Sequence, residues 1–467
     1  MCVDPTHPAL TGTPVLKRCF TWGNPKTALF APRRGFIPRN NMQTQTKELT
    51  YNLAEWKQGY RSQKQEYDYQ ITEIEGQIPA ELTGTLFRNG PGMLDINDVS
   101  VRHPFDGDGM ICRITLQNGK AHFCNRFVQT EAYQAEQIAG KFLYRGVFGT
   151  QKEGGWKTNA FDVNLKNIAN TQVVYWGGKL LALWEAAEPH RLDPKTLDTL
   201  GIEYLNNTLK PGDPFAAHPL FDPNGRMVNF GLKAGKFDRT GLLTEITIYE
   251  LDLDGEVVEQ HSHVIPGFAF IHDFAITPNY CIFFQNPVGF NPFPFLFGLK
   301  GAAECVKFQP EKLTKILVIP RNPRRGEQMQ TLETKSGFVF HHANAFEHDG
   351  KISIDSIAYP TFPEVEPDKD FREMDFSTLT PGQLWRFEMD LAEIFIGFDF
   401  GEGWISDGID RDFTIVLEGI SMMKHKPRFS FEGLHLLTAA WITGNHQNFS
   451  QLFGLKFDTF SRTFQAK

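Results

Sequence analysis

The feature that most constrains the fold is a series of short strands with apolar alternation, separated by turns rich in Gly, Asn and Asp. Paired strands of this kind are, for example, Met110–Leu116 with Ala121–Val128, and Thr171–Trp176 with Leu180–Glu185. A further strand is expected at Leu243–Leu251, and turns are expected at 89–92 and at 106–109. Such sets recur about every 40 to 55 residues, with no amphipathic stretch of about 10 to 15 residues between strands. The pattern predicts an all-β protein, with a β-propeller of one four-stranded sheet per set as the first choice. A β-sandwich is the alternative, and it explains the length of 467 residues less well.

The composition narrows the class of protein. Hydrophobic residues make up 41% of the chain and charged residues 22%, which is typical of a globular protein with a sizeable core. The net charge of −8 argues against a nucleic acid partner, because binding phosphates requires a basic surface. The six cysteines form no CxxC pair, which indicates reduced thiols in an intracellular protein, and we expect a cytoplasmic location.

The most apolar stretch of the chain is 281–299. It is interrupted by three prolines and two glycines, so we do not expect it to form a helix, and no run reaches the roughly 18 apolar residues of a membrane span. Two interpretations remain open. The stretch is either a buried strand followed by a loop packed on the core, or a strand followed by an exposed aromatic loop, 286–299, that contacts a lipid surface.

Histidines occur at three places where an apolar strand meets a turn. These are His218, His272, and the adjacent pair His341 and His342. They are too far apart in sequence to share a helix face, but they would converge if each came from a separate repeat of a closed β structure. Neutral imidazole is the commonest metal ligand, and a cluster of imidazoles without cysteine favours iron or zinc over magnesium or calcium. Each of these histidines taken alone is more often a structural residue than a ligand.

The segments around these histidines resemble motifs of the carotenoid cleavage oxygenases, the family that includes retinal pigment epithelial membrane protein-like enzymes. The resemblance is carried by Ala217-His-Pro219, Ile271-His-Asp-Phe274, Thr277-Pro-Asn-Tyr280, Phe340-His-His-Ala-Asn-Ala-Phe-Glu347, Gly76-Gln-Ile-Pro79, Gly84-Thr-Leu-Phe-Arg-Asn-Gly-Pro-Gly92 and His103-Pro-Phe-Asp-Gly-Asp-Gly-Met110. The matches run in order from about Leu49 to about Leu391. The sequences of these motifs are most similar to those of the cyanobacterial members.

The resemblance implies a seven-bladed β-propeller that holds iron(II) on His218, His272 and His341. It implies that Glu185 is the carboxylate that orients one of these imidazoles, whereas His342 has a structural role. The family's reaction adds O2 across a double bond of a carotenoid or apocarotenoid and yields two carbonyl products. Members draw their substrates from membranes, which favours peripheral lipid contact through 286–299.

The two ends of the chain differ from the middle. Residues 1–41 are rich in proline, basic and without strand or helix periodicity, which indicates an extension outside the fold. We assign 42–391 to the propeller. The family has a fourth iron-binding histidine near its C-terminus, but the resemblance fades after Leu391. Residues 392–467 contain one proline and eleven phenylalanines, so we expect the last blade or blades to be truncated or divergent, with His435 or His446 as substitutes for the missing ligand.

Three functions follow as hypotheses. The first is an iron(II)-dependent dioxygenase acting on a carotenoid or apocarotenoid. The second is a catalytically inactive propeller that binds an apocarotenoid and has lost its iron. The third is a zinc- or calcium-dependent hydrolase of propeller form, whose activity would not depend on oxygen.

Overall fold

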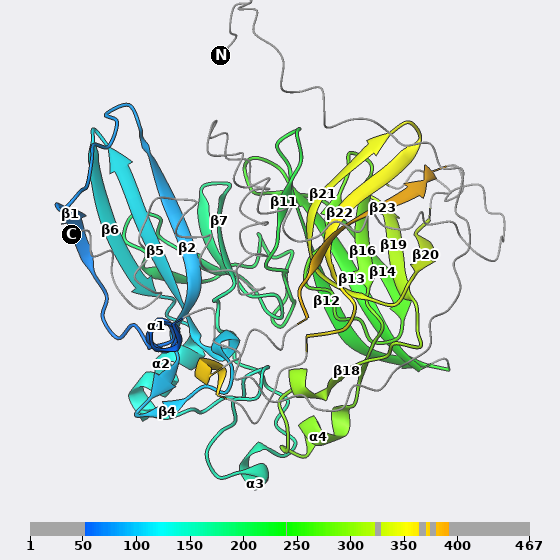
Figure 1. Ribbon diagram of the computed structural model, residues 1–467, viewed down its shortest axis with the longest axis horizontal. Helices are drawn as coiled ribbons and strands as arrows, with labels where there is room; N and C mark the ends of the chain where they lie inside the picture. Colours follow the sequence, from blue (N-terminus) through cyan, green and yellow to red (C-terminus); the bar gives the residue numbers. More distant parts are fainter. Residues whose placement is uncertain (1–51, 240, 323–327, 364–369, 374–379, 392–467) are drawn as a thin grey trace, which may run out of the picture. The chain divides into compact units, whose positions relative to one another are not determined.

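The structure is a computed structural model that describes residues 52–239, 241–322, 328–363, 370–373 and 380–391. The termini and the predicted boundaries at 41/42 and 391/392 lie outside the described residues or at their edge. All described residues belong to the compact unit that begins at Leu49, and this unit is mostly strand (Figure 1). The prediction of an all-β protein is therefore confirmed.

Five antiparallel sheets make up most of the described part of this unit. The first sheet contains β1 (Asp68–Ile71), β6 (Lys120–Phe127), β5 (Asp108–Gln117) and β2 (Gly84–Met93), in that order. The second contains β7 (Gln172–Trp176), β8 (Lys179–Leu183), β9 (His190–Leu192) and β10 (Thr199–Ile202). The third contains β11 (Leu220–Phe221), β12 (Met227–Asp238), β13 (Gly241–Leu251) and β14 (Val257–Pro266).

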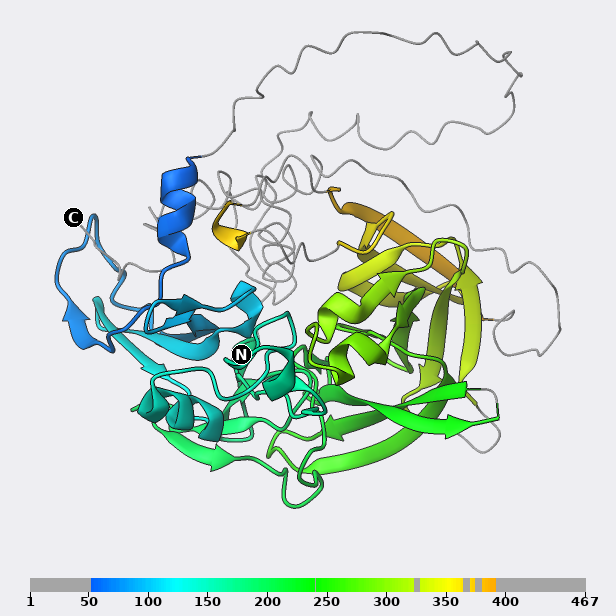
Figure 2. The same ribbon diagram turned by 90° about the horizontal axis from the view of Figure 1, so that it is seen from below.

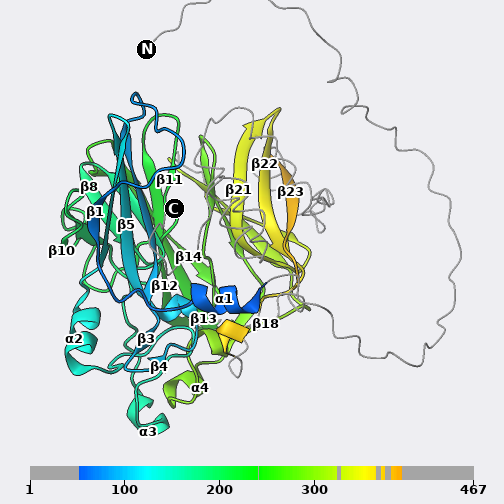
Figure 3. The ribbon, with the colours of Figure 1, turned by 60° about the vertical axis from the view of Figure 1, so that its left-hand side comes forward.

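The fourth sheet contains β15 (Ala275–Ile276), β16 (Tyr280–Gln285), β19 (Thr314–Pro320) and β20 (Gln330–Thr334). The fifth contains β21 (Phe338–His348), β22 (Lys351–Tyr359) and β23 (Gln383–Asp390), which lie side by side in Figure 3. Two small hairpins are formed by β3 (Asp95–Ile96) with β4 (Val99–Ser100), and by β17 (Val288–Phe290) with β18 (Val306–Phe308). The short helices are α1 (Leu53–Gly59), α2 (Glu131–Ala139), α3 (Trp156–Asn159), α4 (Pro292–Leu296) and the 3₁₀ turns η1 (Pro104–Asp106), η2 (Ala303–Cys305) and η3 (Phe371–Glu373).

The hydrophobic core lies between consecutive sheets. In β16, Cys281 and Phe283 face the third sheet, whereas Ile282 and Phe284 face the fifth. This period of two is what a strand with two buried faces requires. Similar clusters join the first sheet to the second and the second to the third. Each fully buried Phe in these layers contributes about 1.5–3 kcal/mol through burial of apolar surface.

Most sheets begin with their innermost strand. The third and fourth sheets start with the two-residue strands β11 and β15, and β15 lies beside β21 of the fifth sheet. In the same way β2 of the first sheet lies beside β7 of the second. In Figure 2 the sheets follow one another in chain order around an arc, as propeller blades do. The number of seven blades stays a prediction, because residues 1–51 and 392–467 lie outside the described part of the chain.

Two local predictions were wrong. We expected a turn at 89–92, but β2 runs through these residues, with Asn89 paired to Ile111 and Gly90 to Met110. The strand tolerates Pro91 because β2 lies at the edge of its sheet, where an N–H is not needed for pairing. We also expected no helix within 281–299, but α4 forms one turn there, with Pro292 at its first position, where proline is tolerated.

Candidate metal centre

Three histidines from three sheets meet at the inner ends of their strands. His218 lies two residues before β11, His272 lies three residues before β15, and His341 lies in β21. The Nε2 atoms of His218 and His272 are 2.9 Å apart, and one ring nitrogen of each of the three lies within 4.8 Å of the others. The ring centroids are 4.5 to 5.2 Å apart. This is the one group of three possible metal-binding side chains among the described residues.

The segment that carries His218 is fixed by its neighbours. The backbone N–H of Ala216 donates to the carbonyl of Phe230 at 2.7 Å, and Asn229 Nδ2 donates to the carbonyl of Ala216 at 2.8 Å. Ala216 and Ala217 are almost fully buried, and their small side chains let the segment pack closely on the second and third sheets. The imidazole of His218 is therefore presented by a backbone with little freedom, and only 6% of the residue is exposed.

β-Bulges explain why the side chains of the two adjacent histidines of β21, His341 and His342, have different surroundings. The pairing of β21 with β22 shifts between Val339 and His341, and again between His342 and Asn344. Bulges of this kind redirect side chains. His341 joins the cluster and is 4% exposed. The His342 ring instead packs on Phe284, and its Nδ1 lies 2.8 Å from Ser356 Oγ.

Glu185 follows β8 of the second sheet and reaches the cluster from there. Its Oε2 lies 2.6 Å from Nδ1 of His272. The carboxylate accepts the Nδ1 proton, which leaves Nε2 of the neutral ring as an acceptor that faces Nε2 of His218. Burial lowers the pKa of His272, but the nearby Glu185 carboxylate outweighs it, and the net pKa is raised. Glu185 thus sets both the tautomer and the basicity of this imidazole.

A second carboxylate holds the histidine-bearing segments together, and no sequence pattern indicated it. Asp273 follows His272 and is 3% exposed. Its Oδ2 accepts the backbone N–H of His342 at 2.9 Å, and its Oδ1 accepts the N–H of Phe274 at 2.8 Å. Asp273 therefore ties the start of the fourth sheet to the strand that carries His341.

The donor set fits a transition metal. Two nitrogens bound to one ion at about 2.1 Å, with bonds at a right angle, lie about 3 Å apart. The separation of 2.9 Å between His218 and His272 agrees with this geometry. Magnesium and calcium prefer oxygen ligands, so three imidazoles favour iron, zinc or a related metal.

Aromatic side chains border one side of the cluster. The Phe340 ring lies 6.0 Å from the His272 ring and 4.5 Å from Phe338. Phe270 and Phe362 extend this aromatic group, and Val306 and Phe308 of the hairpin next to α4 pack against the same hydrophobic cluster. The surroundings of the imidazoles are therefore suited to an apolar ligand.

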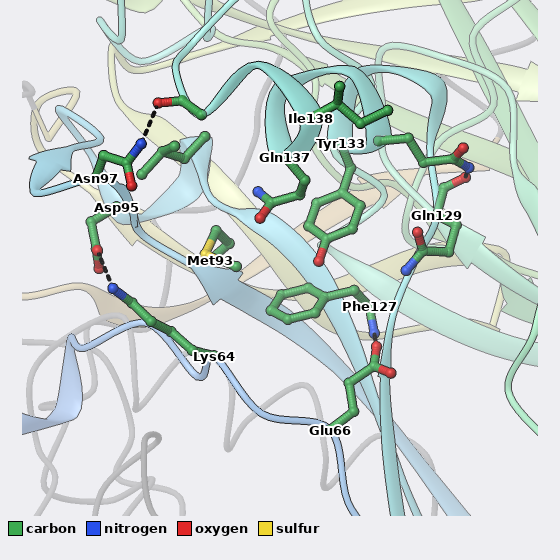
Figure 4. A pocket seen from close by; sticks show the side chains of 13 residues that line it. Lys64, Glu66, Met93, Asp95, Asn97, Phe127, Gln129, Tyr133, Gln137 and Ile138 are labelled. Carbon is green, nitrogen blue, oxygen red and sulfur yellow. Dashed lines mark hydrogen bonds and ion pairs between the residues drawn. The ribbon is translucent and has the colours of Figure 1, made fainter.

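A pocket of about 750 Å³ lies elsewhere, between the first sheet, β3 and α2 (Figure 4). Tyr133 stacks on Phe127 at 5.0 Å beside Met93, and Lys64 pairs with Asp95 at 3.1 Å. Burial and the nearby carboxylates of Asp108 and Glu66 raise the pKa of Tyr133. None of the three histidines lines this pocket.

The motif 106–109, which we expected to be a turn, carries two buried carboxylates. Asp106 accepts N–H groups of Phe148 and Thr150, and Asp108 Oδ2 lies 2.7 Å from Lys166 Nζ. Lys166 also pairs with Glu136 of α2 at 2.6 Å. These acids are structural: they attach α2 and the following loop to the first sheet.

The comparisons with known proteins agree with this geometry. Residues 60–395 match the family model described as retinal pigment epithelial membrane protein. The chain is 49% identical over 353 residues to apocarotenoid-15,15'-oxygenase of Synechocystis sp., which covers 74% of this chain and 70% of that protein. It is 34% identical to resveratrol cleavage oxygenase 1 of Aspergillus fumigatus and 32% identical to isoeugenol monooxygenase of Pseudomonas putida. These two matches span only 56% and 64% of the relatives' own length.

The solved structures give the same result. The crystal structure of cobalt-substituted Synechocystis ACO has a TM-score of 0.71 and 49% sequence identity, and the match covers 74% of this chain and 72% of that one. Cobalt substitution means that this related protein holds a metal ion. Among the described helices of the present chain, none is long and apolar enough to cross a membrane.

Proposed function

Because the chain belongs to the retinal pigment epithelial membrane protein family, we propose that it is a non-haem iron(II) dioxygenase that cleaves a double bond of a carotenoid or apocarotenoid. The observation that carries this proposal is the convergence of His218, His272 and His341, with Glu185 bonded to His272. The identity of 49% to an apocarotenoid oxygenase, against 34% and 32% to the resveratrol and isoeugenol enzymes, favours an apocarotenoid as the substrate.

His218, His272 and His341 would hold the iron through neutral nitrogens. Bound iron(II) would supply the site for dioxygen and the electrons for its activation. An all-imidazole set leaves the double positive charge of the ion uncompensated, unlike a site with two histidines and one carboxylate. Glu185 contributes carboxylate charge indirectly, through His272, and the two side chains are 25% and 17% exposed.

The remaining residues would orient the substrate. Cleavage of a double bond to two carbonyl products needs no general acid or base, so the protein has to place one bond at the metal and exclude water. Phe340, Phe338 and Phe270 form an apolar wall beside the histidines that suits a conjugated chain. A rigid aromatic wall favours an elongated, flat substrate over a compact polar one.

Peripheral lipid contact through 286–299 is part of the same proposal. Phe293, Phe297 and Leu299 are 64%, 45% and 63% exposed. Phe161, which is 72% exposed, packs edge-on against Phe297. Apolar side chains exposed together in this way mark an interaction surface, and an apolar substrate would have to leave a membrane near such a surface.

The domain assignment also stays a proposal: 1–41 as an extension, 42–391 as the oxygenase domain and 392–467 as its divergent remainder. The alternative function depends on this last segment. If it does not complete the site, the protein would be an apocarotenoid-binding propeller without iron.

Metal analysis combined with an oxygen assay tests the function. The purified protein is loaded with iron(II) without air, and an apocarotenoid is added with and without O2. The dioxygenase predicts stoichiometric iron and bleaching of the pigment only with O2. Retained pigment without iron or bleaching would favour the inactive binding protein, and turnover without O2 would favour a hydrolase.

A further inference from the structure

We propose that His261 and His263 form a second, peripheral metal site on the outer strand of the third sheet, which binds a borderline divalent cation such as Cu²⁺ or Zn²⁺. Nδ1 of His261 and Nε2 of His263 face each other at 2.8 Å. The ring centroids are 5.0 Å apart and the rings are perpendicular. The distance between the two ring nitrogens is close to the 2.9 Å between the Nε2 atoms of His218 and His272 in the candidate metal centre.

The strand produces this arrangement directly. His261 and His263 are two residues apart in β14, so their side chains leave the same face of the strand. Ser262 between them points to the opposite face, where it bonds to Thr247 at 2.8 Å. β14 is the last strand of its sheet, and both histidines are half-buried, so an ion has access from solvent.

A third contact orients the pair. Nε2 of His261 lies 3.2 Å from the backbone carbonyl of Arg321, to which it donates. Metal-binding histidines commonly donate their other N–H to a carbonyl, because this fixes the tautomer and turns the free nitrogen to the ion. His261 Nδ1 is then an acceptor, and an ion would take the place of the proton that it now shares with His263. Partial burial and the neighbouring imidazole lower the pKa of His263, so the ring is neutral and able to bind.

The site would be open and of moderate affinity. Among the described residues, no third histidine, cysteine or carboxylate joins this pair within ligand distance, so water would complete the coordination. Imidazole nitrogens suit copper and zinc, and a given nitrogen site binds Cu²⁺ more tightly than Zn²⁺. We expect the same order here.

The position of His261 and His263 links the proposed second ion to the candidate metal centre through Arg321. Arg321, whose carbonyl orients His261, follows β19 of the fourth sheet, and its side chain pairs with Asp222 and Glu250 of the third-sheet segment. The third and fourth sheets carry His218 and His272. An ion on His261 and His263 would therefore stabilise the junction that positions two of the three central imidazoles, and it would raise the melting temperature by mass action.

Metal titration of the iron-loaded, tag-free protein tests the proposal. With Zn²⁺ or Cu²⁺ added, we expect one further ion per chain by equilibrium dialysis, iron content unchanged, and nitrogen hyperfine splitting in the Cu²⁺ electron paramagnetic resonance spectrum. His261→Gln and His263→Gln should each weaken binding at least tenfold and abolish the rise in melting temperature. His348→Gln, which removes a surface histidine of β21, is the matched control and should bind as the wild type does.

Two results would overturn the proposal. One is the absence of a further ion at any metal ratio that leaves the iron in place. The other is binding that persists in both glutamine variants. Either result leaves the proposed oxygenase function untouched, because these histidines lie outside the candidate metal centre.

Discussion

The Glu185 carboxylate of the second sheet lies 2.6 Å from Nδ1 of His272, which the fourth sheet carries. The ring orientation of a candidate ligand thus depends on a sheet that contributes no histidine to the cluster. The His218 segment, packed between the second and third sheets, lies between these two partners in the chain. The candidate metal centre is therefore built by four successive sheets, the second to the fifth, because His341 comes from β21 of the fifth.

This contact predicts the effect of Glu185→Gln. The amide oxygen still accepts the Nδ1 proton, but the negative charge that raises the basicity of His272 is lost. We expect metal affinity to fall about 10- to 100-fold, measured as iron retained against a competing chelator. Glu188→Gln is the control, because Glu188 accepts an N–H of Gly212 and contacts no histidine of the cluster. Equal losses in both variants would contradict the role of Glu185.

Arg321 predicts a large effect on stability. Its guanidinium is 3% exposed and pairs with Glu250, which is fully buried, at 2.7 Å and with Asp222 at 2.8 Å. Arg321→Met leaves these carboxylates without their buried partner and should cost about 3–5 kcal/mol of unfolding free energy. Arg226→Met removes a 41% exposed partner of the same Glu250 and should cost about 1 kcal/mol or less. Denaturant titration distinguishes the two, and similar losses would show that burial of the pair is not what matters.

The close packing around Gly109 predicts that a side chain at this position destabilises the protein through a steric clash. A Cβ at this position would lie 2.2 Å from the carbonyl oxygen of Ala169, which belongs to the segment that leads into the second sheet. Gly109→Ala forces these backbones apart and should cost about 1–3 kcal/mol. Gly84→Ala, in the paired strand β2, meets no atom within 4 Å and serves as the control. A stable Gly109→Ala protein with an unchanged melting temperature would contradict the close packing.

The lowered pKa of the buried His190 predicts that the free energy of unfolding depends on pH. Burial lowers its pKa to about 4 in the folded protein, against about 6.5 in the unfolded chain. Between these values only the unfolded state takes up the proton, so stability present above pH 6.5 is lost as the pH falls towards 4. From pH 7 to pH 5 this loss amounts to about 2 kcal/mol.

His190→Gln should remove that part of the pH dependence, and urea unfolding at pH 7 and pH 5 measures it. His348→Gln, on the surface of β21, should keep the wild-type dependence. If His190→Gln showed the same loss as the wild type between the two pH values, His190 would not be the responsible group.

The sequence predicted the strands best where alternation was strong. The runs around Met110, Leu180 and Leu243 became paired strands, and those around Leu180 and Leu243 bury apolar side chains against both neighbouring sheets. The expected turn at 89–92 failed because the paired residues of β5 hold Asn89 and Gly90 in the ladder. Turn propensity is a local quantity, and here the tertiary pairing outweighed it.

The candidate site was predicted in part. The motifs identified His218, His272, His341 and Glu185, which the structure brings together, and separated His341 from His342. Residue patterns alone did not separate that pair, because the bulges that redirect it arise from pairing with β22. Asp273 and the Arg321 network were missed, since the partners of Arg321 lie 71 and 99 residues away in sequence.

The iron content of two adjacent variants decides which histidines hold the metal. His341 belongs to the imidazole cluster, whereas the His342 ring bonds to Ser356 and packs on Phe284. After loading with iron(II) and removal of free metal, mass spectrometry should find one iron per chain in the wild type and in His342→Ala, and almost none in His341→Ala. Equal iron in the two variants, or its loss only from His342→Ala, would contradict the proposal that His218, His272 and His341 hold the metal.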